Sequence, residues 1–200
     1  MSRVPNEAEC LAILREAGCS SRVIVHCLTV TTLARRMAEM TQADVELVVA
    51  GAMLHDLGRS RSHRIDHAVQ GMRLAREMGL PEEVVEIIKR HIGAGMGPDE
   101  AAELGLPEDD YFPRTLEQRI VSHADNLTSD DHYVGHDEVM SKYERKGLPY
   151  QVERVEAMHR ELSGLCGVDI DDLAKEVSAC GARAGRRDSD PGGRGTSGHS

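Results

Sequence analysis

The sequence predicts an all-α protein, a single-domain helical bundle, from two observations. Apolar residues recur at the three- and four-residue spacing of amphipathic helices, as at Val23, Val30, Leu33 and Met37, and no stretch alternates apolar and polar residues as a strand does. The chain has 200 residues, of which 40% are hydrophobic, and this is enough for one ordinary domain with a substantial core. We therefore expect one helical domain over residues 1–178.

The first two helices are predicted from apolar spacing and from residues that begin or end helices. One helix is expected before Gly18, which stops it. Ser20 or Ser21 is expected to cap a second helix over residues 22–40, in which His26 falls on the apolar stripe. A histidine is thereby placed in a row of side chains that faces the core.

The third helix is expected to lie at the centre of the bundle because it is apolar on most sides. Asp44 is expected to cap it, and His55-Asp56 ends it. Two adjacent polar residues therefore lie at the end of a buried helix.

The remaining helices carry further histidines and a carboxylate at their ends or edges. They are expected over residues 67–78, 82–91, 115–127, 136–145, 149–165 and 171–177. Asp66 is expected to cap the helix that His67 opens, and His91 closes the next one. Asp125 falls at the edge of the inward face of the helix over residues 115–127.

Two segments depart from helical periodicity. Residues 93–113 contain seven Gly or Pro and predict a long loop with one helical turn at residues 100–104. Residues 179–200 are rich in Gly, Arg, Ser and Asp without an apolar period, so a disordered tail is expected there.

Composition restricts the classes of function. The formal net charge of -10 disfavours a general nucleic-acid-binding protein, because phosphate contacts need clustered Lys and Arg. Five cysteines without a CxxC pair argue against a disulfide framework and against a thiolate zinc site. With no signal sequence and no apolar run of about 20 residues, we expect a cytoplasmic protein that does not bind membranes.

One group of residues has the chemistry of a metal site. His26, the pair His55-Asp56 and Asp125 combine imidazole nitrogen with carboxylate oxygen, which suits Zn, Fe, Mn, Co, Ni or Mg without distinguishing among them. The imidazoles of His67 and His91, at helix ends, allow a second ion that Asp56 would bridge. Two ions about 3.5 to 4 Å apart can clamp both oxygens of an in-line displacement at phosphorus.

The order of these residues resembles the HD superfamily of metal-dependent phosphohydrolases, in particular its small stand-alone members. The pattern runs from His26 through 55–59 (HDLGR), His67 with Gly71 four residues later, and His91, to 124–125 (AD). The resemblance covers residues 20–127 and implies a helical bundle. The related cyclic-dinucleotide hydrolases carry a GYP signature after the HD pair, and this sequence lacks it. A cyclic-dinucleotide substrate is therefore not expected.

The resemblance also implies how the metals are held, with divalent ions expected at two positions in each chain. The first ion is expected at His26, His55, Asp56 and Asp125. Asp56 would bridge to the second ion, and the ligands specific to that ion are expected to be His67 and His91.

Catalytic roles are expected for Asp56 and for Arg59, whose guanidinium could hold a phosphate oxygen by a forked contact. Arg61, Arg64 and Lys89 are further candidates for binding substrate charge. No residue stands out as the general acid.

A single histidine indicates a metal ligand less strongly than the linked pattern of histidines and aspartates does. A lone His on an apolar stripe is more often a hydrogen-bonded core residue than a ligand. The histidines outside the pattern are expected at the surface or beside the ligands rather than on a metal: His63, His123, His132, His136 and His159.

The expected function is hydrolysis of a phosphoester in a small phosphorylated, nucleotide-like substrate by metal-activated hydroxide. The enzyme would be a phosphodiesterase or a phosphomonoesterase, and a cyclic 2′,3′-phosphate, a pyrophosphate, a pterin or a sugar phosphate stays open. Two alternatives remain, a di-iron HD-type oxygenase and a non-catalytic nucleotide-sensing HD module. The sequence leaves homo-oligomerisation open.

Overall fold

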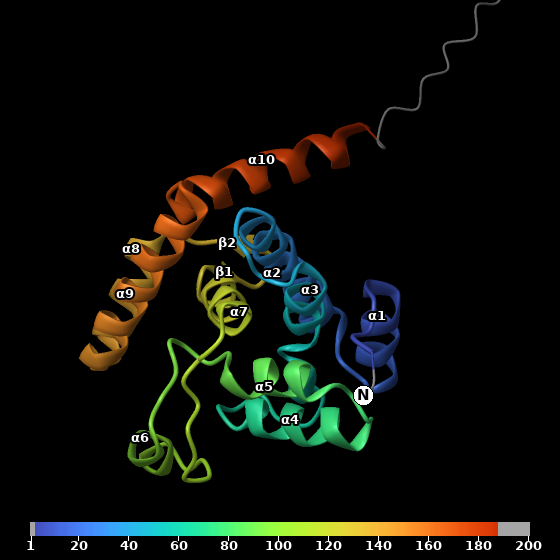
Figure 1. Ribbon diagram of the computed structural model, residues 1–200, viewed down its shortest axis with the longest axis vertical. Coiled ribbons are helices and arrows are strands. Elements are labelled where there is room, and N and C mark those ends of the chain that lie inside the picture. The colour runs from blue at the N-terminus through green and yellow to red at the C-terminus, as the bar shows by residue number, and fades with distance from the viewer. Residues whose placement is uncertain (1–2, 188–200) are drawn as a thin grey trace, which may run out of the picture.

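The structure is a computed structural model that describes residues 3–187, and it confirms the all-α prediction. Within these residues, ten α-helices are joined by mostly short connections (Figure 1). Their bounds are α1 Glu7–Glu16, α2 Ser21–Glu39, α3 Val45–Leu54, α4 His67–Glu77, α5 Glu82–Arg90, α6 Pro98–Glu103, α7 Leu116–Asn126, α8 His136–Arg145, α9 Pro149–Cys166 and α10 Ile170–Arg187. A 3-10 helix, η1, covers Leu57–Ser60, and two short strands, β1 Thr128–Ser129 and β2 His132–Tyr133, pair antiparallel.

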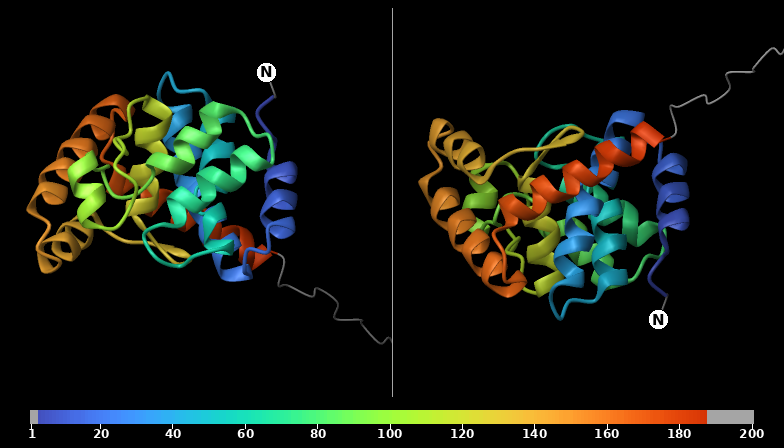
Figure 2. Two further views of the ribbon diagram at one scale, coloured as in Figure 1. Left: turned by 90° about the horizontal axis from the view of Figure 1, so that it is seen from below. Right: turned by 90° about the horizontal axis from the view of Figure 1, so that it is seen from above.

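Three helices, α2, α3 and α7, contact one another at the centre of the molecule. The α4 and α5 pair packs on α3 and α7 through α5, while α8 and α9 form a second pair that joins α7 through α9. Figure 2 shows α10 crossing α2 on one face of the molecule and the α4 and α5 pair on the opposite face. Side chains of the central helices can therefore contact residues of the α4 and α5 pair as well as residues of the α8 and α9 pair.

Helix starts follow the predicted caps with one exception. The side chains of Ser20 and Asp44 accept hydrogen bonds from backbone N–H groups of the following first turns, as predicted. Thr115, predicted as the first residue of its helix, instead caps α7 in the same way. Asp66 does not cap α4: it has helical backbone angles, and its carboxylate instead accepts a hydrogen bond from the Ser62 hydroxyl at 2.5 Å. The predicted cap is wrong because a closer donor in the preceding loop takes its place.

Glycines bring the helices that carry the histidines into close contact. A Cβ on Gly58 would lie 1.9 Å from the carbonyl oxygen of His67 and 2.4 Å from the backbone nitrogen of Gly71. A Cβ on Gly51 would lie 2.6 Å from the Ile87 side chain. The segment after α3 can approach α4, and α3 can approach α5, only because these positions lack a side chain.

Three segments differ from the prediction or extend it. The loop over residues 93–113 contains α6, Pro98–Glu103, which overlaps the predicted turn at residues 100–104 but begins two residues earlier. The small sheet after α7 had no signal in the sequence, since each strand has only two residues. Helix α10 runs to Arg187 instead of ending at residue 177, with Leu173 and Ala174 packed into the core. The rest of the expected tail, residues 188–200, lies outside the described residues.

No helix within the described residues is long and apolar enough to cross a membrane.

Candidate metal centre

The first group of candidate ligands comes from three central elements. His26 lies on α2, His55 follows the last residue of α3, and Asp125 lies near the end of α7. His26 Nε2 is 2.9 Å from Asp125 Oδ1, and His55 Nε2 is 3.4 Å from the same oxygen. The structure therefore brings together three residues that are up to 99 positions apart in the chain.

The second group lies on the α4 and α5 side. Asp56, His67 at the start of α4 and His91 after the end of α5 are all buried. The Nε2 atoms of the two histidines lie 3.0 Å apart, and His67 Nε2 is 3.1 Å from Asp56 Oδ1. The close approach of α4 and α5 at the glycines therefore places both imidazoles beside the carboxylate of Asp56.

Asp56 lies between the two groups and offers a different oxygen to each. Its Oδ2 is 3.9 Å from His26 Nε2 and 3.8 Å from His55 Nε2. Its Oδ1 is 3.1 Å from His67 Nε2 and 3.7 Å from His91 Nε2. A carboxylate placed in this way can bridge two cations.

The four imidazoles share one orientation, because each Nδ1 lies beside a backbone carbonyl oxygen and is therefore its donor. The pairs are His26 with Asp130 at 3.1 Å and, each at 2.7 Å, His55 with Ala52, His67 with Arg64 and His91 with Ile88. In the neutral form of each ring, this leaves the lone pair on Nε2, directed at the carboxylates. Two lone pairs 3.0 Å apart, as on His67 and His91, repel each other unless a proton or a metal ion lies between them.

The electrostatics of the centre are those of buried, opposed charges. Burial opposes a charge on His55, but the carboxylates of Asp56 and Asp125 outweigh burial and raise the pKa of the imidazole to about 9. Burial would raise the pKa of Asp56, but His55 and the other imidazoles hold it well below its usual range. The pKa of His91 is lowered to about 3 by burial and by the positive charge of its histidine neighbours.

The residues present fit divalent metal ions. Among the described residues, His55 Nε2 and Asp56 Oδ1 are buried atoms without a hydrogen-bond partner. Buried polar atoms without partners are costly, and a bound cation would satisfy both. The donor set of imidazole nitrogens and carboxylate oxygens suits the metals named above, with one ion at each group.

The centre opens into a cavity of about 610 Å³. Of the predicted cationic residues, Arg59 and Arg64 line it. Arg59 also donates from Nε to Asp56 Oδ2 at 2.7 Å, so it holds that carboxylate in place. Arg61 pairs with Glu77 and Lys89 with Asp109, and neither lines the cavity. The structure therefore does not bring these two cations to the site.

One wall of the cavity consists of residues that were not predicted to belong to the site. Lys142, Tyr143 and Lys146 reach it from α8, and Tyr150 reaches it from α9. Within the described residues, neither lysine amine forms an ion pair, although both line the cavity. The spacing of the lysines, four residues apart on a helix, is a signal of a shared face, but it does not say which face meets the cavity.

Three of the histidines outside the pattern are not at the surface. His123, His136 and His159 are buried and meet in a separate cluster. Of the two positions predicted for these histidines, at the surface or beside the ligands, the surface position is wrong for these three, because α8 packs on α9 and α9 packs on α7. His63 and His132 are exposed, as expected.

Comparison with known proteins places this centre in a family context. A family model described as HD domain matches residues 23–130. An uncharacterized protein of Methanocaldococcus jannaschii is 44% identical over 163 residues, which cover 78% of this chain and 95% of that protein. The family model spans the candidate ligands from His26 to Asp125.

Other relatives are longer. A tRNA (cytidine(56)-2′-O)-methyltransferase of Picrophilus torridus is 42% identical over 174 residues, covering 87% of this chain and 51% of that protein. The chain thus spans about half the length of this relative and of a similar one from Thermoplasma volcanium. Ribonuclease Y of Acidothermus cellulolyticus is 31% identical over 175 residues, covering 78% of this chain and 31% of that protein.

The fold is also found in a solved structure, the HD domain of the L. monocytogenes phosphodiesterase PgpH in complex with cyclic-di-AMP. The TM-score is 0.51 at 15% sequence identity, with 76% of this chain and 96% of that chain covered. The similarity concerns the helical arrangement.

Proposed function

The chain belongs to the HD domain family, and from this premise we propose that it is a metal-dependent phosphohydrolase that cleaves a phosphoester in a small nucleotide-like substrate. One observation carries the proposal. Two groups of buried nitrogen and oxygen atoms share Asp56, and they open into a cavity that also has cationic side chains in its wall. A substrate with a phosphate group matches both features.

The roles of the protein's residues follow from their positions. His26, His55 and Asp125 would hold one divalent ion, His67 and His91 the other, and Asp56 both. Bound divalent ions supply Lewis acidity, which activates water and stabilises negative charge on the phosphate oxygens. The backbone carbonyls behind the imidazoles keep each Nε2 directed at the site.

Arg59 is proposed as a positioning and binding residue. Its Nε holds Asp56, and its guanidinium lines the cavity with further N–H donors. A planar guanidinium can contact a carboxylate and a phosphate oxygen at the same time. Arg59 would thereby link the bridging carboxylate to the substrate.

The size and charge of the cavity favour a small anionic substrate. About 610 Å³ lies in the range of pockets for drug-sized ligands. Arg64, Lys142 and Lys146 add positive charge to its wall, while the chain as a whole carries a formal charge of -10. Local cations within an acidic protein favour a mono- or dinucleotide over a long nucleic acid.

Among phosphoesters, we favour a nucleotide phosphodiester, including a 2′,3′-cyclic phosphate. The support is the relative named ribonuclease Y, which shares most of this chain's length, though the match covers less than a third of that protein. The methyltransferases are about twice as long as the region they share with this chain, so we do not carry methyl transfer over to it.

The test combines metal analysis with a panel of substrates. Protein purified without oxygen is analysed for metal content, and product formation is then measured on nucleotide monophosphates, 2′,3′- and 3′,5′-cyclic nucleotides and dinucleotides. We expect two ions per chain and metal-dependent cleavage of diesters. The control is Asp56→Asn, which keeps the shape of the side chain but removes its charge.

Two results would overturn the proposal. Bound iron with O₂ consumption and no cleavage of any phosphoester would favour an oxygenase. Tight nucleotide binding without turnover in the metal-loaded protein would favour a sensing module.

A further inference from the structure

A second cluster of histidines lies outside the centre described above. His123 comes from α7, His136 is the first residue of α8, and His159 lies in the second half of α9. Their exposed fractions are 0%, 8% and 9%. Three imidazoles from three helices therefore meet in the interior, where polar side chains are rare unless they have partners.

The ring nitrogens of this cluster are close enough to share one ion. One nitrogen from each ring lies within 4.8 Å of one nitrogen from each of the others. His123 Nε2 is 3.0 Å from His159 Nδ1, and the rings of His136 and His159 are stacked with their centroids 4.0 Å apart. Ligand nitrogens about 2.0 to 2.1 Å from a zinc ion would lie at comparable separations from each other.

Carboxylates lie behind two of the three rings. His136 Nε2 is 2.8 Å from Glu156 Oε2, and His159 Nε2 is 3.6 Å from Asp169 Oδ1. A ring that donates Nε2–H to a carboxylate keeps its lone pair on Nδ1. Carboxylates in this position are typical of histidines that bind metal, because they fix the tautomer and increase the basicity of the ligand nitrogen.

Two nitrogens of the cluster are left without a partner among the described residues. His136 Nδ1 and His123 Nδ1 are buried and accept or donate no hydrogen bond. His136 Nδ1 is also the atom that the contact with Glu156 leaves with a lone pair. A buried lone pair without a donor is costly, and a cation would compensate for it.

We propose that His123, His136 and His159 form a structural binding site for a zinc-class divalent transition-metal ion, which fixes the α8 and α9 pair to α7. Three neutral imidazoles are a ligand set that zinc accepts, and a water would complete four-coordination. The ion would add a connection between these helices to the hydrophobic core that they share.

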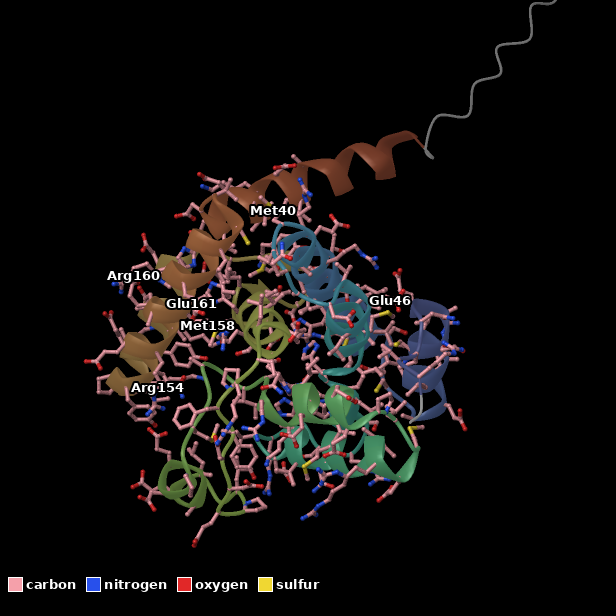
Figure 3. The ribbon with its side chains drawn as sticks, in the orientation of Figure 1. Met40, Glu46, Arg154, Met158, Arg160 and Glu161 are labelled. Atoms are coloured by element: carbon pink, nitrogen blue, oxygen red, sulfur yellow. The ribbon has the colours of Figure 1, made fainter. Side chains whose placement is uncertain are left out.

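A structural role fits the surroundings of the cluster better than a catalytic one. None of the three histidines lines the cavity of the first centre or a second, smaller cavity beside Arg154 and Met158. On α9, Met158 faces α7 and Arg160 points outward (Figure 3), and His159 between them is 9% exposed. A substrate would have no access to the ion.

The site would nevertheless affect the cavity of the first centre. Lys142 and Lys146 line that cavity from α8, and Tyr150 and Gln151 line it from α9. An ion that holds these two helices on α7 would therefore set the position of one cavity wall relative to Asp125, which lies two residues after His123.

The main test counts zinc in the full chain after removal of metal and reloading with zinc chloride. We compare the unmodified protein with His136→Gln, since the glutamine amide can keep the hydrogen bond to Glu156 while the Nδ1 ligand is lost. The matched control is His132→Gln, at an exposed histidine near the same helices. We expect His136→Gln to hold one zinc fewer per chain and His132→Gln to hold the same number.

A second readout follows thermal unfolding. In a background with Asp56→Asn and Asp125→Asn, zinc at about 100 times its Kd should raise the Tm by roughly 5 to 10 °C. Adding His136→Gln should abolish this rise, and adding His132→Gln should not.

A third measurement does not depend on whether any variant folds. In crystals of the unmodified protein grown with zinc, anomalous diffraction at the zinc edge should show a peak among the three rings. Equal zinc content in the unmodified protein and folded His136→Gln, or no anomalous peak at this position, would overturn the proposal and leave a cluster of stacked, hydrogen-bonded histidines. Because zinc rather than turnover is measured, the result is independent of the proposed hydrolase activity.

Discussion

The two histidine clusters differ in how their rings are held and in what they face. In the centre around Asp56, every imidazole is backed by a backbone carbonyl and the group opens into a cavity. In the cluster of His123, His136 and His159, two rings are backed by side-chain carboxylates and the group is enclosed. The first arrangement leaves room for a substrate, and the second holds helices together.

The difference between the two clusters is tested most directly by changing one residue in each and comparing the loss of activity. Asp56→Asn should lower phosphoester cleavage by about 10³-fold or more, because both proposed ion positions lose their shared charged ligand. His136→Gln should lower kcat far less, since it contacts no substrate. Steady-state kinetics of both variants check this. Equal losses of kcat would mean that the second cluster also takes part in the chemistry.

A side chain added at Gly58 should disturb the first centre, because it would push the backbone of α4 away. Gly58→Ala should destabilise the protein by about 3 kcal/mol or more and reduce metal content, because the added Cβ would overlap the His67 carbonyl oxygen. The matched control is Gly164→Ala in α9, where a Cβ meets no atom within 4 Å and where alanine should stabilise the helix slightly. Urea unfolding measures both. A neutral Gly58→Ala would show that α4 is not packed as closely as described.

The cavity wall on α8 gives a smaller effect. Replacing Lys142 and Lys146 by Met should raise KM about tenfold with little change in kcat, because about 1.4 kcal/mol of phosphate binding is lost. Lys175→Met is the control, since this lysine pairs with Asp172 on α10 outside the cavity. An unchanged KM in the double variant would remove α8 from the substrate-binding surface.

A further effect concerns the protonation of His55. Because the pKa of His55 is raised to about 9 in the metal-free protein, the ring is protonated at pH 7 and must lose a proton to bind an ion. Metal affinity at this centre should therefore increase about tenfold per pH unit from 7 to 9 and level off above pH 9. His91, with a pKa lowered to about 3, contributes no proton in this range.

Calorimetry of metal binding in buffers of different ionisation enthalpy measures this proton release directly. We expect about one proton per chain at pH 7 from His55. A flat affinity between pH 7 and pH 9 would show that His55 is already neutral before the ion binds.

Most of the helices and the candidate ligands of the first centre could be predicted from local sequence signals. Caps such as Asp44 and the apolar period of α2 act within a few residues, so they can be read without knowing what the helix packs against. His26 was placed on an inward face for the same reason. The adjacent pair His55-Asp56 needs only one helix end to reach the site.

Contacts between residues on different helices could not be predicted from the sequence and are seen only in the tertiary structure. His123, His136 and His159 have no common spacing, and they come together because α8 and α9 fold back on α7. The same folding brings Lys142 to the cavity, while pairing with Asp109 keeps Lys89 away from it. Local periodicity fixes the face of a helix on which a side chain lies, but the packing of helices far apart in the sequence fixes what that face contacts.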